Sequence, residues 1–307
     1  MSAQLDQSEH VIVFERLKKA TAPTVLLLSA SMLRGTSIGA DTKDRLWKIL
    51  QRYAAYFDVF TEASLVNGMK VRVSSNPRVE QEIFLFGEWE PLFTRYLRSI
   101  PPNDGIFLDI GANIGYFSLV ACSSFREVHA IEASPSTNRR LVENIAANNI
   151  DNIHVYQTAV GGIEGHIDFY QNREQSGGAS VFRTEASLFE ASVPIAPVEV
   201  ILDGIDWGRV RFVKIDVEGL EAPVLDSLLR LRTLLHPGVE IFVEYSPDRR
   251  DSWPSIKAFL ENGFSAFLLQ GPYDRRDYLE PLRRSALKPV NNPPVEFCDI
   301  LIRRDTS

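Results

Sequence analysis

The segment FLDIGANIGYF, residues 107–117, places a carboxylate just before a glycine-rich turn. Apolar residues lead into the turn and those after it have helical spacing, so the pattern predicts a strand, a tight turn and a helix. Nucleotide-like cofactors are commonly held at such a junction, with a phosphate at the helix N-terminus. Asp109 lies two residues before Gly111 and would repel a phosphate. Either Asp109 points away from the ligand, or the ligand here is not a phosphate.

The glycine spacing also differs from that of a dinucleotide site. The turn contains Gly111, Asn113 and Gly115 in the order G-A-N-I-G, whereas dinucleotide sites have G-x-G-x-x-G. Asparagine tolerates the left-handed conformation that the middle position needs. Glu132 ends the next predicted strand, where a carboxylate accepts hydrogen bonds from two ribose hydroxyls. Since Asp109 suits an ammonium group, the prediction is S-adenosylmethionine; the alternative is that Asp109 caps the turn and Glu132 is solvated.

A second polar group lies in VKIDVEG, where Lys214, Asp216 and Glu218 alternate and leave the strand on one face. Asp216 and Glu218 come at the carboxyl end of that strand, where open α/β sheets bind ligands. A carboxylate can take the proton released when an alcohol oxygen is methylated, and a divalent ion bridging the pair is the alternative. The metal-free version is the prediction, because no third carboxylate adjoins them. A structural ion pair between Lys214 and Asp216 is the other interpretation.

Neighbouring strand ends supply further candidates. Glu244 and Tyr245 end the next strand and are expected to contact the acceptor. Ala159 and Val160 follow the third strand and are expected to flank the adenine. Ordinary strand packing is the alternative for each of these residues.

The histidines are poorly placed for a general base. His129 lies inside the second predicted strand, and His154 begins the third, at the wrong end of the sheet. His166 follows the third strand, where a surface role is the simpler interpretation. A carboxylate base is therefore the prediction.

The elements that must position these residues alternate between strand and helix from residue 105 onward. The expected strands cover 106–110, 127–133, 153–160, 210–219, 239–246, 265–270 and 295–304, with helices at 115–125, 134–149, 221–235 and 253–262. This alternation predicts an α/β fold with a doubly wound, mostly parallel sheet. No helix separates the final two strands, so they are expected to be antiparallel and to end the sheet in a reversed hairpin.

The first part of the chain has a different pattern. Asn67-Gly68 lies between alternating apolar residues in 64–75, which predicts a β-hairpin, and helical patterning occurs at 41–57 and 88–99. We expect an N-terminal extension over residues 1–80 that packs beside the ligand edge as a cap, followed by the main domain over 81–307. A second insertion at about 165–200 is expected to shape the substrate pocket.

Several of these segments together resemble one family. FLDIGANIGYFSL, HAIEASP, LD at 202–203, FVKIDVEGLEAPVL and FVEYSP are similar to the FkbM-type family of class I S-adenosylmethionine-dependent methyltransferases. The resemblance covers about residues 80–270. It implies a Rossmann-like sheet of seven strands with an antiparallel last strand, and O-methylation of a hydroxyl on a sugar, polyketide or other secondary metabolite. Glu90, in GEWEP, resembles the family's segment before the glycine motif and is expected to close over the methionine tail.

Composition limits the other classes of function. The 307 residues carry 33 basic and 40 acidic side chains, a net charge of −7, which argues against non-specific nucleic-acid binding. No apolar run is long enough to span a membrane, and the two cysteines have no metal-ligand spacing, so a reduced, cytoplasmic protein is expected. The competing hypotheses are an NAD(P)-dependent oxidoreductase and a non-catalytic cofactor-binding module. The acceptor and the oligomeric state, a homo-oligomer included, stay open.

Overall fold

A computed structural model describes residues 28, 30, 33–34, 39–57, 60–74, 78–172, 179–180, 187–217, 219–249, 252–270, 276–279 and 287–305. The chain forms two compact units. One comprises Met1–Trp89 with Arg275–Pro281, and the other comprises Glu90–Asp274 with Leu282–Ser307. The sequence had suggested a boundary after residue 80, and no local pattern indicates that 275–281 returns to the first unit. Within the described ranges, no helix is both long and apolar enough to cross a membrane.

The first unit contains the predicted hairpin. Strands β1 (Phe60–Ser64) and β2 (Lys70–Ser74) pair antiparallel, with Ser64 opposite Lys70. The turn between them uses Gly68 at φ +85°, and the side-chain oxygen of Asn67 accepts a hydrogen bond from the Met69 amide. The Asn-Gly signal therefore identified the turn correctly.

Among the helices that accompany the hairpin in the described part of this unit are α2 (Ala40–Phe57), α3 (Arg78–Phe86) and α10 (Arg276–Leu279). Trp47 of α2 is fully buried and meets Phe86 at 4.9 Å and Tyr278 at 5.8 Å between ring centroids. These aromatic contacts attach the short returning helix α10 to α2.

The second unit is built on an eight-stranded sheet in the order β13-β12-β14-β11-β10-β3-β4-β5. The strands are β3 (Ile106–Ile110), β4 (Glu127–Ile131), β5 (Ile153–Tyr156), β10 (Val210–Ile215), β11 (Glu240–Tyr245), β12 (Phe264–Gln270), β13 (Lys288–Pro289) and β14 (Cys298–Arg304). Neighbours from β5 to β11 pair parallel, and β14 is antiparallel to both of its neighbours. The predicted seven-stranded, mostly parallel sheet is confirmed, and the two-residue β13 extends its edge.

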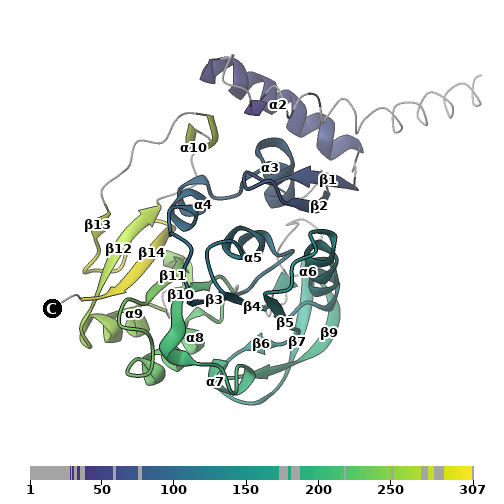
Figure 1. The fold of residues 1–307 in the computed structure, drawn as a ribbon. Coiled ribbons are helices and arrows are strands. Elements are labelled where there is room, and N and C mark those ends of the chain that lie inside the picture. The colour runs from purple at the N-terminus through teal and green to yellow at the C-terminus, as the bar shows by residue number, and fades with distance from the viewer. Residues whose placement is uncertain are drawn as a thin grey trace, which may run out of the picture. The chain divides into compact units, whose positions relative to one another are not determined.

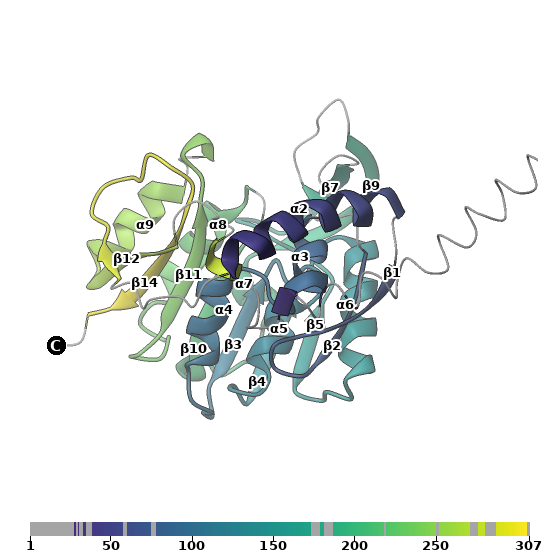
Figure 2. The same cartoon turned by 90° about the horizontal axis from the view of Figure 1, so that it is seen from above.

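Helices cover both faces of this sheet (Figures 1 and 2). One face carries α4 (Pro91–Arg98), α5 (Tyr116–Ala121) and α6 (Pro135–Ala147), and the other carries α7 (Val198–Ile201), α8 (Glu221–Leu231) and α9 (Ser252–Leu260). Every residue of β3 is buried, as expected for a central strand covered on both sides. Two 3-10 turns, Trp207–Arg209 and Pro247–Arg249, complete the helical elements of the described residues.

The expected antiparallel pairing of the final two long strands is confirmed, because β12 pairs with β14, and β14 lies between β12 and β11. One strand prediction needs correction. The expected third strand, 153–160, is divided: β5 joins the large sheet, whereas β6 (Ala159–Val160) joins a second sheet of order β6-β9-β7-β8. That sheet is formed by the predicted insertion, with β7 (Gly165–Asn172), β8 (Ala179–Ser180) and β9 (Ser187–Ala196).

Candidate functional site

The glycine turn leaves the carboxyl end of β3 and is held in place by backbone contacts. The amides of Gly111 and Ala112 both donate to the Ile131 carbonyl at the end of β4, at 2.9 and 3.0 Å. Gly111 has φ +82°, and a Cβ on it would lie 1.7 Å from the backbone oxygen of Asp216. Position 111 therefore requires glycine, because the backbone just after β10 leaves no room for a Cβ. The sequence had suggested a different reason, the approach of a cofactor.

The rest of the turn also uses left-handed backbone. Asn113 has φ +51° and Gly115 has φ +90°, which confirms that the asparagine takes the middle left-handed position. A Cβ on Gly115 would lie 2.4 Å from a methyl of Leu141, so this glycine allows α5 and α6 to approach closely. The Asn144 side chain donates to the Ile114 carbonyl at 2.8 Å and fixes the turn from α6.

Glu132 follows β4 directly and faces the turn. Its two carboxylate oxygens accept one backbone hydrogen bond each, from Asn113 and from Ser134, both at 2.9 Å. Burial raises the pKa of Glu132 to about 7, although these amides oppose the shift. Each carboxylate oxygen has a second lone pair, so the group can still accept hydrogen bonds from two hydroxyls.

Asp109 points into the protein. It is fully buried, its Oδ2 accepts a hydrogen bond of 2.6 Å from the Ser118 hydroxyl, and its Oδ1 lies 3.6 Å from the Lys214 ammonium. Burial raises the pKa of Asp109 above its ordinary value, while Lys214 and Ser118 lower it. Of the two possibilities raised by the sequence, this geometry favours an Asp109 that organises the site from beneath. Direct contact with a cofactor stays a prediction for Asp109.

Lys214 connects the glycine turn to β10. Its ammonium donates to the Gly111 carbonyl and to Asp216 Oδ2, both at 3.1 Å, and it is almost completely buried. Burial alone lowers the pKa of Lys214, but the carboxylates of Asp216, Asp109 and Glu90 outweigh it and raise that pKa above its usual value. Lys214 is therefore a permanent cation that holds acidic groups together.

Asp216 differs from its neighbours because it reaches solvent. Its side chain is 31% exposed, and its amide donates to the Ile110 carbonyl at 3.0 Å, just past the end of β10. The predicted alternation of Lys214 and Asp216 on one face agrees with their contact. Glu218 lies outside the described residues. Asp216 is thus partly open to solvent, as is Glu244, whereas Asp109 and Glu132 are buried.

Two further carboxylates lie around Lys214. Glu90 precedes α4 with a left-handed φ of 44°, an uncommon conformation for glutamate, and its side chain is buried. Asp299 of β14 lies opposite Glu244 in the sheet register and is 1% exposed. Burial and then the charges of Glu90, Glu244 and Asp216 raise the pKa of Asp299 well above its ordinary value. These surroundings favour the protonated form of Asp299.

Sequence reasoning missed Asp299 and Ser118. Asp299 interrupts the apolar run of the last strand, and that interruption was the available signal. Its proximity to Glu244 depends on β14 inserting beside β11, which no local pattern reveals. Ser118 lies one helical turn into α5, on the face toward Asp109.

The insertion contributes another residue that the sequence did not indicate. Glu190 of β9 accepts hydrogen bonds from the Ser134 hydroxyl, at 2.9 Å from each carboxylate oxygen, and from the Ser136 amide at 3.0 Å. A carboxylate at the start of α6 complements the partial positive charge of the helix N-terminus. Because Ser134 also contacts Glu132, the insertion is tied to the backbone that holds Glu132.

Three other predicted site residues are buried in packed layers. Tyr245 is fully buried in the main core and meets Trp253 edge to face at 6.1 Å. Val160 belongs to the same core, and Ala159 packs against Phe169 in a smaller cluster with the insertion. The burial of Tyr245 supports packing over acceptor contact, and a role for Ala159 and Val160 beside an adenine stays a prediction.

Comparisons with known proteins agree with this geometry. The profile of the methyltransferase FkbM domain matches residues 109–266, from the carboxylate before the glycine turn into β12. Methyltransferase 1 of Beauveria bassiana (strain ARSEF 2860) is 25% identical over 148 residues, which is 41% of this chain and 59% of that relative's length.

Among solved structures, the methyltransferase FkbM of Methylobacillus flagellatus KT has 14% sequence identity and a TM-score of 0.40. The match covers 73% of this chain and 52% of that one. TYW2 of P. horikoshii, solved in complex with MeSAdo, has 17% identity and a TM-score of 0.43, over 80% of this chain and 71% of the other. The domain match extends over just over half of the 307 residues and contains the turn, Glu132, Lys214 and Asp216. The chain belongs to the FkbM family of methyltransferases.

Proposed function

We propose that this FkbM-family protein transfers a methyl group from S-adenosylmethionine to a hydroxyl oxygen of a small molecule, such as a sugar, a polyketide or another secondary metabolite. The observation that carries the proposal is Glu132, a buried carboxylate with acceptor capacity left, placed beside a left-handed glycine turn at the carboxyl edge of the sheet. Family membership supports methyl transfer over the NAD(P)-dependent alternative.

The charges around the turn fit a cationic cofactor. The carboxylates of Asp216, Asp109 and Glu90 act on Lys214, so carboxylates outnumber cations in this part of the described structure. A ligand with an ammonium and a sulfonium gains from that field, whereas a pyrophosphate is repelled. We propose that Glu132 binds the ribose hydroxyls and that the turn lies along the amino-acid tail. S-adenosylmethionine, when bound, supplies an electrophilic methyl group.

Asp216 is the proposed general base. Its side chain is partly exposed, and Lys214 fixes one of its oxygens at 3.1 Å. Asp216 takes the proton of the acceptor hydroxyl as that oxygen gains the methyl group, and Lys214 acts as a positioning residue. Glu218 and Glu244 are proposed to contact the acceptor. We propose no divalent metal in this step.

The test combines binding with product analysis. Calorimetric titration is expected to show saturable binding of S-adenosylmethionine and none of NAD. Incubation with a panel of hydroxylated acceptors is expected to give a product heavier by one methyl group, with or without EDTA. Binding of NAD alone would restore the oxidoreductase hypothesis. Cofactor binding with no product from any hydroxylated, amine or thiol acceptor would favour the non-catalytic module.

A further inference from the structure

A second polar cluster lies at the amino half of the same sheet. Glu127 and His129 are two residues apart on β4, so their side chains leave the strand on the same face. His154 of the edge strand β5 is in register with His129, with ring centroids 5.0 Å apart. One ligand atom from each of these three residues lies within 4.8 Å of the others.

Nε2 of His129 has no hydrogen bond among the described residues, and its contact is with the Glu127 carboxylate. The side chain is nine-tenths buried, and within the described structure no hydrogen bond reaches Nε2. The nearest carboxylate oxygen, Glu127 Oε2, is 3.7 Å away, which is too long for a hydrogen bond. Nδ1 lies 2.9 Å from the Tyr156 hydroxyl. With Nδ1 donating to that hydroxyl, the lone pair of Nε2 faces Glu127.

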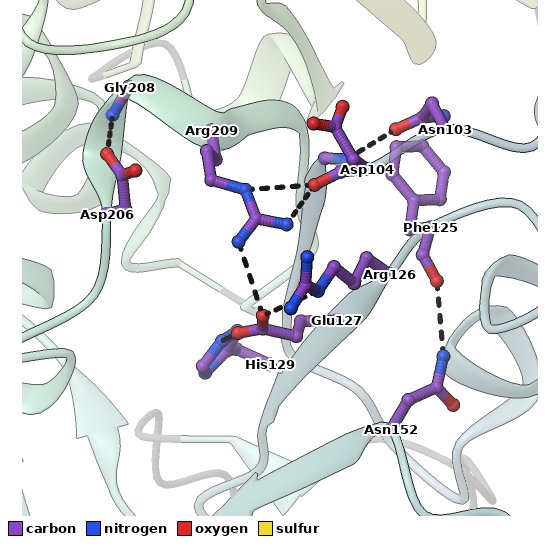
Figure 3. Close-up of polar contacts among 11 residues, drawn as sticks. Asn103, Asp104, Phe125, Arg126, Glu127, His129, Asn152, Asp206, Gly208 and Arg209 are labelled. Carbon is purple, nitrogen blue, oxygen red and sulfur yellow. Dashed lines mark hydrogen bonds and ion pairs between the residues drawn. The ribbon is translucent and has the colours of Figure 1, made fainter.

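The two oxygens of Glu127 have different surroundings. Oε1 faces Arg209 at 3.5 Å and Arg126 at 3.8 Å, whereas Oε2 faces His129 (Figure 3). Arg209 is itself fixed, because its guanidinium donates to the Asp104 carbonyl. The arginine therefore positions the carboxylate and leaves Oε2 on the histidine side.

We propose that Glu127, His129 and His154 form a binding site for a divalent transition-metal ion, with Zn²⁺ as the best fit. Two imidazoles and one carboxylate oxygen are ligands that zinc accepts, with water in the fourth position. Ligand atoms of a tetrahedral zinc ion are roughly 3.4 Å apart. The 3.7 Å distance between His129 Nε2 and Glu127 Oε2 is near that value. The exposed His154 side chain would rotate to bring its ring nitrogen to a similar distance.

The hydrogen bond between His129 Nδ1 and the Tyr156 hydroxyl fits this assignment when Nδ1 is the donor. Metal-bound histidines commonly donate their other ring nitrogen to a neighbouring group, which fixes the orientation of the ring. The ion would join β5, the edge strand of the sheet, to β4. It lies at the opposite end of β4 from Glu132, so we assign it a structural role separate from methyl transfer.

The experiment uses the full chain without a polyhistidine tag, stripped with EDTA, dialysed, and titrated with ZnCl₂ in a calorimeter. Wild-type protein is expected to bind one Zn²⁺ per chain and to bind no Mg²⁺ at this site. His154→Ala changes an exposed side chain, and Glu127→Gln keeps the shape of the carboxylate; each is expected to weaken Zn²⁺ binding at least tenfold. His166→Ala removes an exposed strand histidine outside the cluster and serves as the control.

Circular dichroism checks that each variant is folded. Absence of saturable Zn²⁺ binding, or equal affinity in wild type and His154→Ala, would overturn the proposal. Equal weakening by His154→Ala and His166→Ala would overturn it as well, because the ion would then be bound elsewhere.

Discussion

The two ends of β4 carry similar side chains in different settings. At its carboxyl end, Glu132 is held by amides of an irregular, left-handed turn, and the nearby groups are mostly acidic. At its amino end, Glu127 and His129 lie on regular strand and face another histidine and two arginines. The first arrangement suits an extended cationic ligand that needs room above the strand ends. The second suits a single ion between two strands.

The largest expected effect comes from Gly111→Ala. A Cβ there would meet the Asp216 oxygen at 1.7 Å, and the residue would have to keep φ +82°. We expect a loss of about 3 kcal/mol or more in the free energy of unfolding, measured by urea denaturation.

Gly162→Ala is the matched control. Nothing lies within 4 Å of its Cβ position, so its effect should stay within about 0.5 kcal/mol. Equal stability of the two variants would mean that the turn is not locked against residue 216.

Asp216→Asn tests whether the exposed carboxylate acts as the base. With a working acceptor, we expect turnover to fall about a hundredfold, the scale of a lost general base, while cofactor affinity changes little. Asp151→Asn, on an exposed carboxylate outside the site, is the control for charge. Normal turnover in Asp216→Asn would remove this residue from proton transfer and direct attention to Glu218.

Glu132→Gln tests the ribose contact and its pH dependence. Hydroxyl donors favour the ionised carboxylate, whose pKa is about 7 before binding. Wild-type affinity for S-adenosylmethionine should therefore fall as the pH decreases from 8 to 6. The variant should bind about 1.5–3 kcal/mol more weakly and lose that pH dependence. Calorimetry at several pH values measures both effects, and an unchanged affinity would place the ribose elsewhere.

Asp299→Asn should have the smallest effect. The raised pKa of Asp299 favours its protonated carboxyl, and asparagine resembles that neutral form in shape. We expect a change in stability below about 1 kcal/mol at pH 7. Because the pKa of Asp299 is higher in the folded state than in the unfolded state, its protonated carboxyl stabilises the fold fully at low pH. This contribution is lost as the pH rises through the folded-state pKa. The free energy of unfolding of the variant should therefore fall less than that of wild type as the pH is raised. A loss above 2 kcal/mol at pH 7 would show that the ionised form supports Lys214.

Local spacing made the carboxyl-end site predictable. The turn, Glu132 and the alternation of Lys214 with Asp216 are all encoded within short segments, so the sequence located them without a structure. Asp299 and His154 could not be assigned in this way, because strand register brings them to their neighbours. Glu190 reaches Ser134 and Ser136 at the start of α6 through the folding of the insertion, which no local pattern reveals. His154 was even set aside as lying at the wrong end of the sheet, which is where the proposed ion site is.

In the fold, too, local features could be predicted from the sequence and non-local ones could not. Strand and helix alternation predicted the sheet, and the Asn-Gly pair predicted the hairpin. The position of β14 between β11 and β12 is non-local, and so is the return of 275–281 to the first unit. The split of 153–160 into β5 and β6 follows from the insertion, because β9 supplies a competing partner for β6.

The place of β14 has a consequence for synthesis. Ribosomes deliver the strands of this sheet in order, and β14 emerges after β11 and β12, whose only shared neighbour it is within the described sheet. A nascent chain can pair β10 with β11, yet β12 can pair only with the two-residue β13 until residues 298–304 have left the ribosome. Asp299 arrives with that strand. The group of carboxyl side chains around Lys214 is thus complete only when β14 has joined the sheet. A message truncated before codon 298 therefore yields a product that lacks both β14 and Asp299.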